Sequence, residues 1–143
     1  MVPQLFINLA VKDVERTKAF FTDLGFQFNL EYSNENGLCM ILNESSCVML
    51  LKEEFFQSFT NKPVSDAFKT TETLISPTLE SREAVDALVD KAISLGAKEY
   101  NPPKDHGFMY FRVFEDLDGH QWEWSWLNMD YKPENLKARI SCL

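Results

Sequence analysis

The pattern of hydrophobic and polar positions divides the chain into two similar halves. In the first half, a short apolar run at 5–11 precedes Asp13, a residue type that caps helices, and a helical pattern that ends at Gly25. Strand-like segments follow, bounded by turn-rich clusters, at 26–32, 38–42 and 47–51. The first half therefore predicts the order βαβββ.

The second half repeats this order. A strand-like segment at 73–79 precedes Ser81, which can cap a helix whose apolar residues keep helical spacing until Gly96. The phrase DLGF before the first stop is echoed by SLGA before the second, and the second helix is expected to be about three residues longer. The remaining strand candidates are 98–100, 107–114 and 120–126, the last two joined by the turn DLDG.

Two tandem βαβββ units predict a single α+β domain over residues 1–143. The units cover about 3–52 and 72–127, with a crossover at 53–71 and a C-terminal tail at 128–143. The crossover carries four phenylalanines among polar residues, so it either packs its own side chains as a connector or forms a lid over a pocket. The tail is charged and is either free or docked on a partner subunit.

Two motifs add a family resemblance to this repeat. The stretch LAVKDVERTKAFFTDLGF opens the first unit and FEDLDGHQWE closes the second. In this order they resemble the vicinal oxygen chelate superfamily, which includes glyoxalase I, extradiol dioxygenases and bleomycin-resistance proteins, over roughly residues 3–127. The resemblance implies a curved mixed sheet around a pocket, helices on the outer face, and commonly a homodimer. In metal-using members, four strands each supply one ligand to a divalent ion that acts as a Lewis acid.

The alternation of side chains along the last strand indicates which residues face the pocket. The resemblance places Glu123 in the pocket, so Gln121 and Ser125 are expected beside it, because successive strand residues point to opposite faces. The tryptophans at 122, 124 and 126 are then expected against the helices, where indole rings bury large apolar areas.

The other three metal positions of the family fall on apolar residues. Matching the first motif puts Phe6 at the first position; the second falls on Leu50, or on Met49 if the register slips by one, and the third on Leu74. None of these side chains is a ligand for a hard divalent ion. The sequence therefore predicts no metal and no cofactor, and His106 and His120 are interpreted as solvated loop residues.

The predicted pocket is apolar at its floor and polar at its rim. Arg112 shares a strand face with Tyr110 and either neutralises Glu123, lies solvated at the strand edge, or anchors an anionic ligand. Ser76 and Thr78 are further candidates for the lining. The predicted pocket residues are Phe6, Asn8, Leu50, Leu74, Tyr110, Arg112, Gln121, Glu123 and Ser125.

Charge and composition exclude several classes of partner. Fourteen basic against 22 acidic residues give a net charge of -8, which opposes binding to nucleic acids and to anionic membranes. No signal-peptide pattern and no apolar run near the roughly 20 residues of a membrane span is present, so a cytoplasmic protein is expected. The odd set of cysteines at 39, 47 and 142 contains no CxxC motif, and Cys39 and Cys47 are expected in the core.

Two functions from different classes remain open. The first is metal-independent binding of a small organic molecule, such as a drug or toxic metabolite, as in the drug-resistance branch of the family. The second is a glyoxalase I-like lyase or isomerase, with a divalent metal or metal-free, that acts on a small carbonyl compound with Glu123 as candidate base. An interaction role without a ligand is also open.

Overall fold

The two main helices begin at side-chain caps and end at glycines, in a computed structural model that describes residues 3–131. Asp13 accepts a 3.0 Å hydrogen bond from the Arg16 amide at the start of α1 (Val14–Asp23). Ser81 accepts one of 3.0 Å from the Ala84 amide at the start of α3 (Arg82–Ser94), which is 13 residues long against 10 for α1, as expected. Within the described range, no helix has the length and apolar character needed to cross a bilayer.

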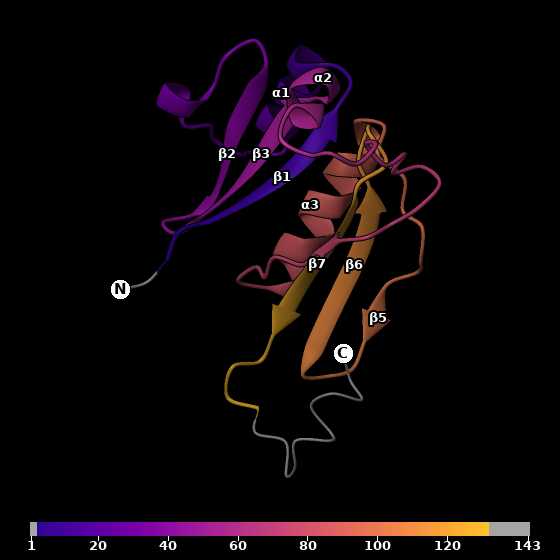
Figure 1. The fold of residues 1–143 in the computed structure, drawn as a ribbon. Helices are drawn as coiled ribbons and strands as arrows, with labels where there is room; N and C mark the ends of the chain where they lie inside the picture. Colours follow the sequence, from indigo (N-terminus) through magenta and orange to yellow (C-terminus); the bar gives the residue numbers. More distant parts are fainter. Residues whose placement is uncertain (1–2, 132–143) are drawn as a thin grey trace.

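The strands form two mixed sheets, one in each half (Figure 1). The first has the order β1-β3-β2, with β1 parallel and β2 antiparallel to β3. The second has the order β4-β7-β6-β5, with β4 parallel to β7. The strands are β1 (Leu5–Val11), β2 (Gly37–Asn43), β3 (Ser46–Lys52), β4 (Leu74–Ile75), β5 (Lys104–Asp105), β6 (Met109–Glu115) and β7 (Gln121–Leu127). The predicted α+β class is confirmed.

Three predicted strands are shorter than the sequence pattern suggested. The segment 26–32 pairs only through a Phe28–Met40 bridge before the 3-10 helix η1 (Leu30–Tyr32). The segment 98–100 pairs through one bridge, and pairing along 73–79 is limited to β4 and a second bridge at Thr78. The crossover begins with the short helix α2 (Glu53–Gln57).

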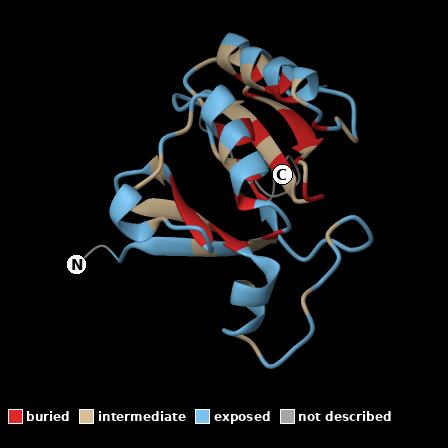
Figure 2. Ribbon diagram, turned by 90° about the horizontal axis from the view of Figure 1, so that it is seen from above, coloured by how far each residue is buried: buried red, intermediate tan, exposed pale blue. Residues whose placement is uncertain are grey.

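A continuous hydrophobic core joins the two halves. Phe21 of α1 lies 5.4 Å from Trp122 of β7 between ring centroids, and Val85 and Val89 of α3 belong to the same fully buried cluster. Leu50 of β3 is also in this cluster, so both helices pack on the core side of the strands. Figure 2 shows the buried parts of the strands and helices turned toward one another.

The opposite face of each sheet, here called its open face, is only partly covered. Strand alternation and cross-strand register assign the residues of both open faces. Phe6 is 45% exposed on the first open face and Leu74 is 51% exposed on the second. The first open face includes Phe6, Asn8, Cys39, Cys47 and Met49; the second includes Leu74, Ser76, Phe111, Val113, Gln121, Glu123 and Ser125.

Candidate functional site

The last strand divides its side chains between the two faces as predicted. Trp122 and Trp124 are 0% and 1% exposed and lie in the core, whereas Gln121, Glu123 and Ser125 are half-buried on the open face. Trp126 packs on the core side and stacks under the guanidinium group of Arg82, 4.8 Å from its ring centroid. The open face of β7 therefore presents a carboxylate between an amide and a hydroxyl group.

A serine hydroxyl contacts Glu123, and a phenol responds to its charge. The Ser76 hydroxyl donates a 2.7 Å hydrogen bond to Glu123 Oε1. Burial raises the pKa of Tyr100 to about 12, and the negative charges of Glu123 and Glu115 add to this shift. Within residues 3–131 no Lys, Arg or His forms an ion pair with Glu123. Its charge is therefore available to a ligand that offers a proton or a hydrogen-bond donor.

The expectation that Tyr110 and Arg112 face the pocket is wrong. Val113 is the residue opposite Glu123, so Arg112 points to the core side, where it is 8% exposed. Its guanidinium group binds both carboxylate oxygens of Glu99 at 2.9 and 3.2 Å. The third guanidinium nitrogen of Arg112 donates hydrogen bonds to α3. The Tyr110 hydroxyl donates a 2.6 Å hydrogen bond to Asp86 of the same helix. Arg112 therefore fixes α3 to the second sheet.

The expectation for Leu50 is also wrong, by one residue. Leu50 is 0% exposed in the core, and its neighbour Met49 takes the open-face position. The four family metal positions thus carry Phe6, Met49, Leu74 and Glu123. The first three offer no ligand for a hard divalent ion, and no group of three His, Cys, Asp or Glu in the described part could hold a metal. These residues do not fit the four-ligand divalent site that the family implies.

A cavity of about 280 Å³ lies where the crossover covers the junction of the two halves. Asn8 of β1 and Gln121 of β7, both expected in the pocket, line it together with Phe56 of α2 and Val64. Thr71, also in the lining, donates a 2.9 Å hydrogen bond to the Gln121 side chain. The crossover therefore occupies the position of the lid that the sequence allowed.

Gly119 allows the crossover to approach the β6–β7 turn. Its φ is 87°, a conformation that glycine adopts without strain. A Cβ atom at this position would lie 2.9 Å from the backbone nitrogen of Phe68. Any larger residue would push the crossover away from the turn and change the shape of the cavity.

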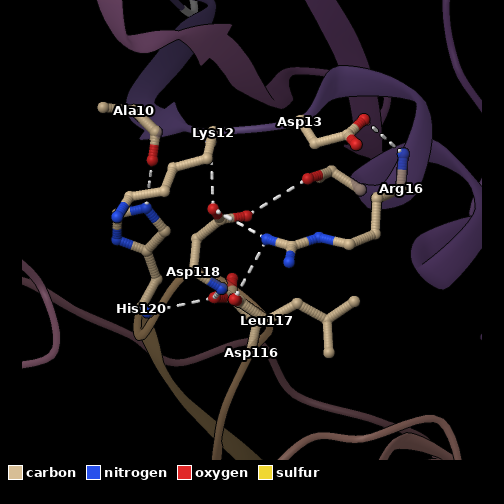
Figure 3. A network of polar contacts seen from close by, with 9 residues as sticks. Ala10, Lys12, Asp13, Arg16, Asp116, Leu117, Asp118 and His120 are labelled. Carbon is tan, nitrogen blue, oxygen red and sulfur yellow. Dashed lines mark hydrogen bonds and ion pairs between the residues drawn. The ribbon is translucent and has the colours of Figure 1, made fainter.

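A polar network in the same turn fixes the cavity wall (Figure 3). The carboxylate of Asp118 accepts hydrogen bonds from the Lys12 amide at 3.0 Å and from the Thr17 hydroxyl at 3.2 Å. His120 Nε2 lies 2.6 Å from the Ala10 carbonyl oxygen. His120 is therefore half-buried in a contact between the halves and is not the solvated residue expected, whereas His106 is exposed and stacks on Phe111.

A second cavity, of about 260 Å³, lies on the first open face. Phe6, Tyr32 and Ile41 line it together with Cys39 and Cys47. Both cysteines were expected in the core: Cys39 is buried as expected, with 0% exposure, whereas Cys47 is half-buried, and both lie on the open-face side of the sheet. The two cavities share no lining residue.

Two halves that each begin with a strand and a helix, helices on the core side and open sheet faces define the glyoxalase-like class of fold. The chain belongs to the Glyoxalase/Bleomycin resistance protein/Dioxygenase superfamily, whose family model matches residues 4–124. No curated protein sequence matches it.

Solved structures share the fold across nearly their whole length. A hypothetical protein, SA1046, from S. aureus is 26% identical, with a TM-score of 0.75 over 87% of this chain and 94% of that chain. A glyoxalase/bleomycin resistance protein/dioxygenase family enzyme from Burkholderia phytofirmans PsJN is 20% identical, with a TM-score of 0.70 over 85% and 96%. The fosfomycin resistance protein FosX from Listeria monocytogenes is 20% identical, with a TM-score of 0.65 over 91% and 98%.

Proposed function

We propose that this protein binds a small, partly apolar organic molecule without the help of a hard divalent ion. The cavity under the crossover carries this proposal, because it brings together Asn8 and Gln121 beneath a segment placed as a lid. The replacement of three metal ligands by Phe6, Met49 and Leu74 supports the metal-independent part. A drug or a toxic metabolite is the kind of ligand that the family membership suggests.

The lining of the cavity limits the chemistry of the ligand. Phe56, Val64 and Leu9 offer apolar contacts, whereas Asn8 and Gln121 offer amide donors and acceptors. Glu123 lies on the same face as Gln121, two residues further along β7. A ligand with an apolar body and a polar group able to donate a hydrogen bond therefore matches the cavity, whereas Glu123 does not line it.

Thermal melting against a compound panel tests the proposal. The panel contains fosfomycin, bleomycin, small thiols and α-keto compounds, each with and without Zn²⁺, Ni²⁺ or Mn²⁺. A ligand that binds only the folded state raises Tm by mass action, so a metal-free shift is expected for at least one organic compound. Shifts that require the divalent ion would contradict metal-independent binding, and no shift with any compound would favour a role without a small ligand.

Matched variants locate the binding site. Gln121→Leu and Phe56→Ala should each raise the Kd of any compound that raises Tm, because each substitution removes a contact from the cavity wall. Asn61→Ala changes an exposed crossover residue outside the lining and should leave the Kd unchanged. Equal affinity in all three variants would place the ligand elsewhere.

Catalysis by Glu123 is the second candidate function. The observation in its favour is the placement of Ser76 and Tyr100 beside a half-buried carboxylate. Such a carboxylate can take a proton from a carbon next to a carbonyl group in a lyase or isomerase reaction. Hemithioacetal or α-keto turnover that is lost in Glu123→Gln, with ligand affinity retained, would support this function over binding alone.

The open faces support a homodimer as part of the proposal. Phe6 and Leu74 leave apolar side chains exposed on edge strands of the two sheets. A second copy of the chain that brought its second open face onto the first would bury both residues and enclose Glu123. The C-terminal strap expected for such an interface falls largely on residues 132–143, outside the described part.

A further inference from the structure

Three sulfur-containing side chains are neighbours in the strand register of the first open face. Cys39 of β2 lies directly opposite Met49 of β3 in the antiparallel register. Cys47 lies on the same face of β3, two residues before Met49, and opposite Ile41. Directly paired residues on one sheet face have Cβ atoms about 4.5–5.5 Å apart, and diagonal neighbours are also within side-chain reach. Two thiols and one thioether are therefore neighbours.

The two cysteine side chains line the same cavity. Burial raises the pKa of Cys39 to about 11, and a side-chain hydrogen bond with Cys47 adds to the shift. Cys39 therefore remains protonated at neutral pH and is a poor nucleophile. Among residues 3–131 both cysteines are free, so neither sulfur is used in a disulfide.

The cavity on this face gives a route to the two cysteine sulfurs, whereas Met49 lies next to Cys39 in the register and does not line it. Cys39 is 0% exposed to solvent but both cysteines line the 260 Å³ cavity, whose other wall residues include Phe6, Tyr32 and Ile41. Glu44 is an acidic residue at the rim of this cavity. An incoming cation thus meets a mainly apolar wall with sulfur donors at its end.

We propose that Cys39, Cys47 and Met49 form a binding site for a soft monovalent metal ion of the Cu(I) type. Thiolate and thioether ligands select Cu(I), whereas Mg²⁺, Ca²⁺ and Mn²⁺ prefer oxygen. Binding forms two metal–thiolate bonds and one metal–thioether contact, and both thiol protons leave to solvent while the ion keeps its oxidation state. The site shares Met49 with the four positions of the divalent site, but both of its thiols, Cys39 and Cys47, lie outside those positions.

Anaerobic competition with a colorimetric Cu(I) chelator tests the proposal on the reduced full-length chain. The expected stoichiometry is one Cu(I) per chain. Cys39→Ser and Cys47→Ser should each weaken Cu(I) affinity by about a hundredfold or more, since even the loss of a residue outside the ligand shell costs about 10- to 100-fold at metal sites. Met49→Leu, which nearly keeps the side-chain volume, should weaken it by about tenfold.

Matched controls separate the site from general effects on the fold. Met40→Leu changes a methionine on the core side of the same strand as Cys39 and should leave the Cu(I) affinity unchanged. Cys142→Ser removes the third cysteine, which lies outside the described residues, and should also leave it unchanged. Circular dichroism checks that each variant is folded. If Cys39→Ser unfolds, the Cu(I) affinities of the Cys47→Ser and Met49→Leu variants, which change half-exposed residues, test the proposal.

Three results would overturn the proposal. They are the absence of chelator competition by the wild-type chain, full Cu(I) affinity in the folded Cys47→Ser variant, and loss of affinity in Cys142→Ser. Because the two cavities share no residue, Gln121→Leu should lose organic-ligand binding and keep Cu(I) binding. The failure of one proposal is thus distinguishable from failure of the other.

Discussion

The hydroxyl group of Ser76, the residue after β4, donates a 2.7 Å hydrogen bond to the carboxylate of Glu123 in β7 on the second open face. This contact orients the carboxylate without neutralising it, because Ser76 carries no charge. The residue beside them, Tyr100, responds to that charge through a raised pKa. Loss of the Glu123 charge is therefore expected to lower the pKa of Tyr100, whose main shift comes from burial.

The first prediction concerns this tyrosine. In Glu123→Gln the pKa of Tyr100 should fall below about 12 because one negative charge is lost, and should stay above the ordinary value near 10 because burial, the largest cause of the shift, remains. The pKa of Tyr110, also about 12, should stay unchanged, since its shift comes from burial and Asp86. Spectrophotometric titration of the phenols measures both values, with Tyr100→Phe and Tyr110→Phe to assign them. A shift of Tyr110 but not of Tyr100 would contradict the geometry.

The same two tyrosines predict how stability depends on alkaline pH. Each has a higher pKa in the folded state than in the unfolded state, so the folded state holds its protons more tightly. The contribution of these raised pKa values to the free energy of unfolding is fully present below about pH 10 and is lost as the pH rises toward 12. Urea unfolding across this range should show a smaller pH-dependent loss in Tyr100→Phe than in the wild-type chain.

Arg112 is predicted to act on stability and not on ligand binding. Arg112→Lys removes the two-point contact with Glu99 and should lower the free energy of unfolding by about 2 kcal/mol. This is below the cost of breaking a fully buried pair because Asp86 and Asp90 are largely exposed. Chemical denaturation measures the loss, and the Kd of any ligand found in the melting panel should not change. A large change in Kd with normal stability would restore Arg112 as a pocket residue.

The contact between Asp118 and the start of α1 is predicted to stabilise the whole chain. Asp118→Ala leaves the Lys12 amide and the Thr17 hydroxyl without their acceptor, and should cost about 3 kcal/mol of unfolding free energy. Asp23→Asn removes a negative charge from an exposed position of the same helix and should change stability by less than about 0.5 kcal/mol. Equal losses would show that net charge, and not this contact, is responsible.

Periodicity in the sequence was sufficient for the long helices and most long strands, but not for the short strand β5 or for every strand face. Trp122 and Trp124 were placed correctly because β7 alternates regularly between large apolar and polar residues. Strand β3 gives no such signal: Val48, Leu50 and Leu51 are all buried, so the placement of Leu50 depended on a register that was wrong by one residue. A slip of one residue moves a side chain to the opposite face of the sheet. For this reason the prediction placed Leu50 on the open face, where the structure has Met49.

Side-chain partners from distant segments could not be predicted from local pattern. Arg112 occurs in a strand whose residues are apolar on both sides, and only the three-dimensional packing of α3 shows that its carboxylate partners lie on the core side. The crossover lacks periodicity, so its position over Gln121 became clear only in the structure. The sequence motif DLDG predicted the turn, whereas the contact of His120 with Ala10 joins positions 110 residues apart.

The proposed dimer predicts that charges on the open faces separate the subunits. Leu74→Glu places a carboxylate where a second copy would bury an apolar side chain, and an unpaired buried charge is strongly unfavourable. The same substitution at Ile93, which is 38% exposed on the outer side of α3, serves as the control. Sedimentation equilibrium should show a dimer for the wild-type chain and for Ile93→Glu, and a monomer for Leu74→Glu. A wild-type monomer at micromolar concentration, or a dimer that survives Leu74→Glu, would leave Glu123 open to solvent and would contradict an enclosed site between two copies.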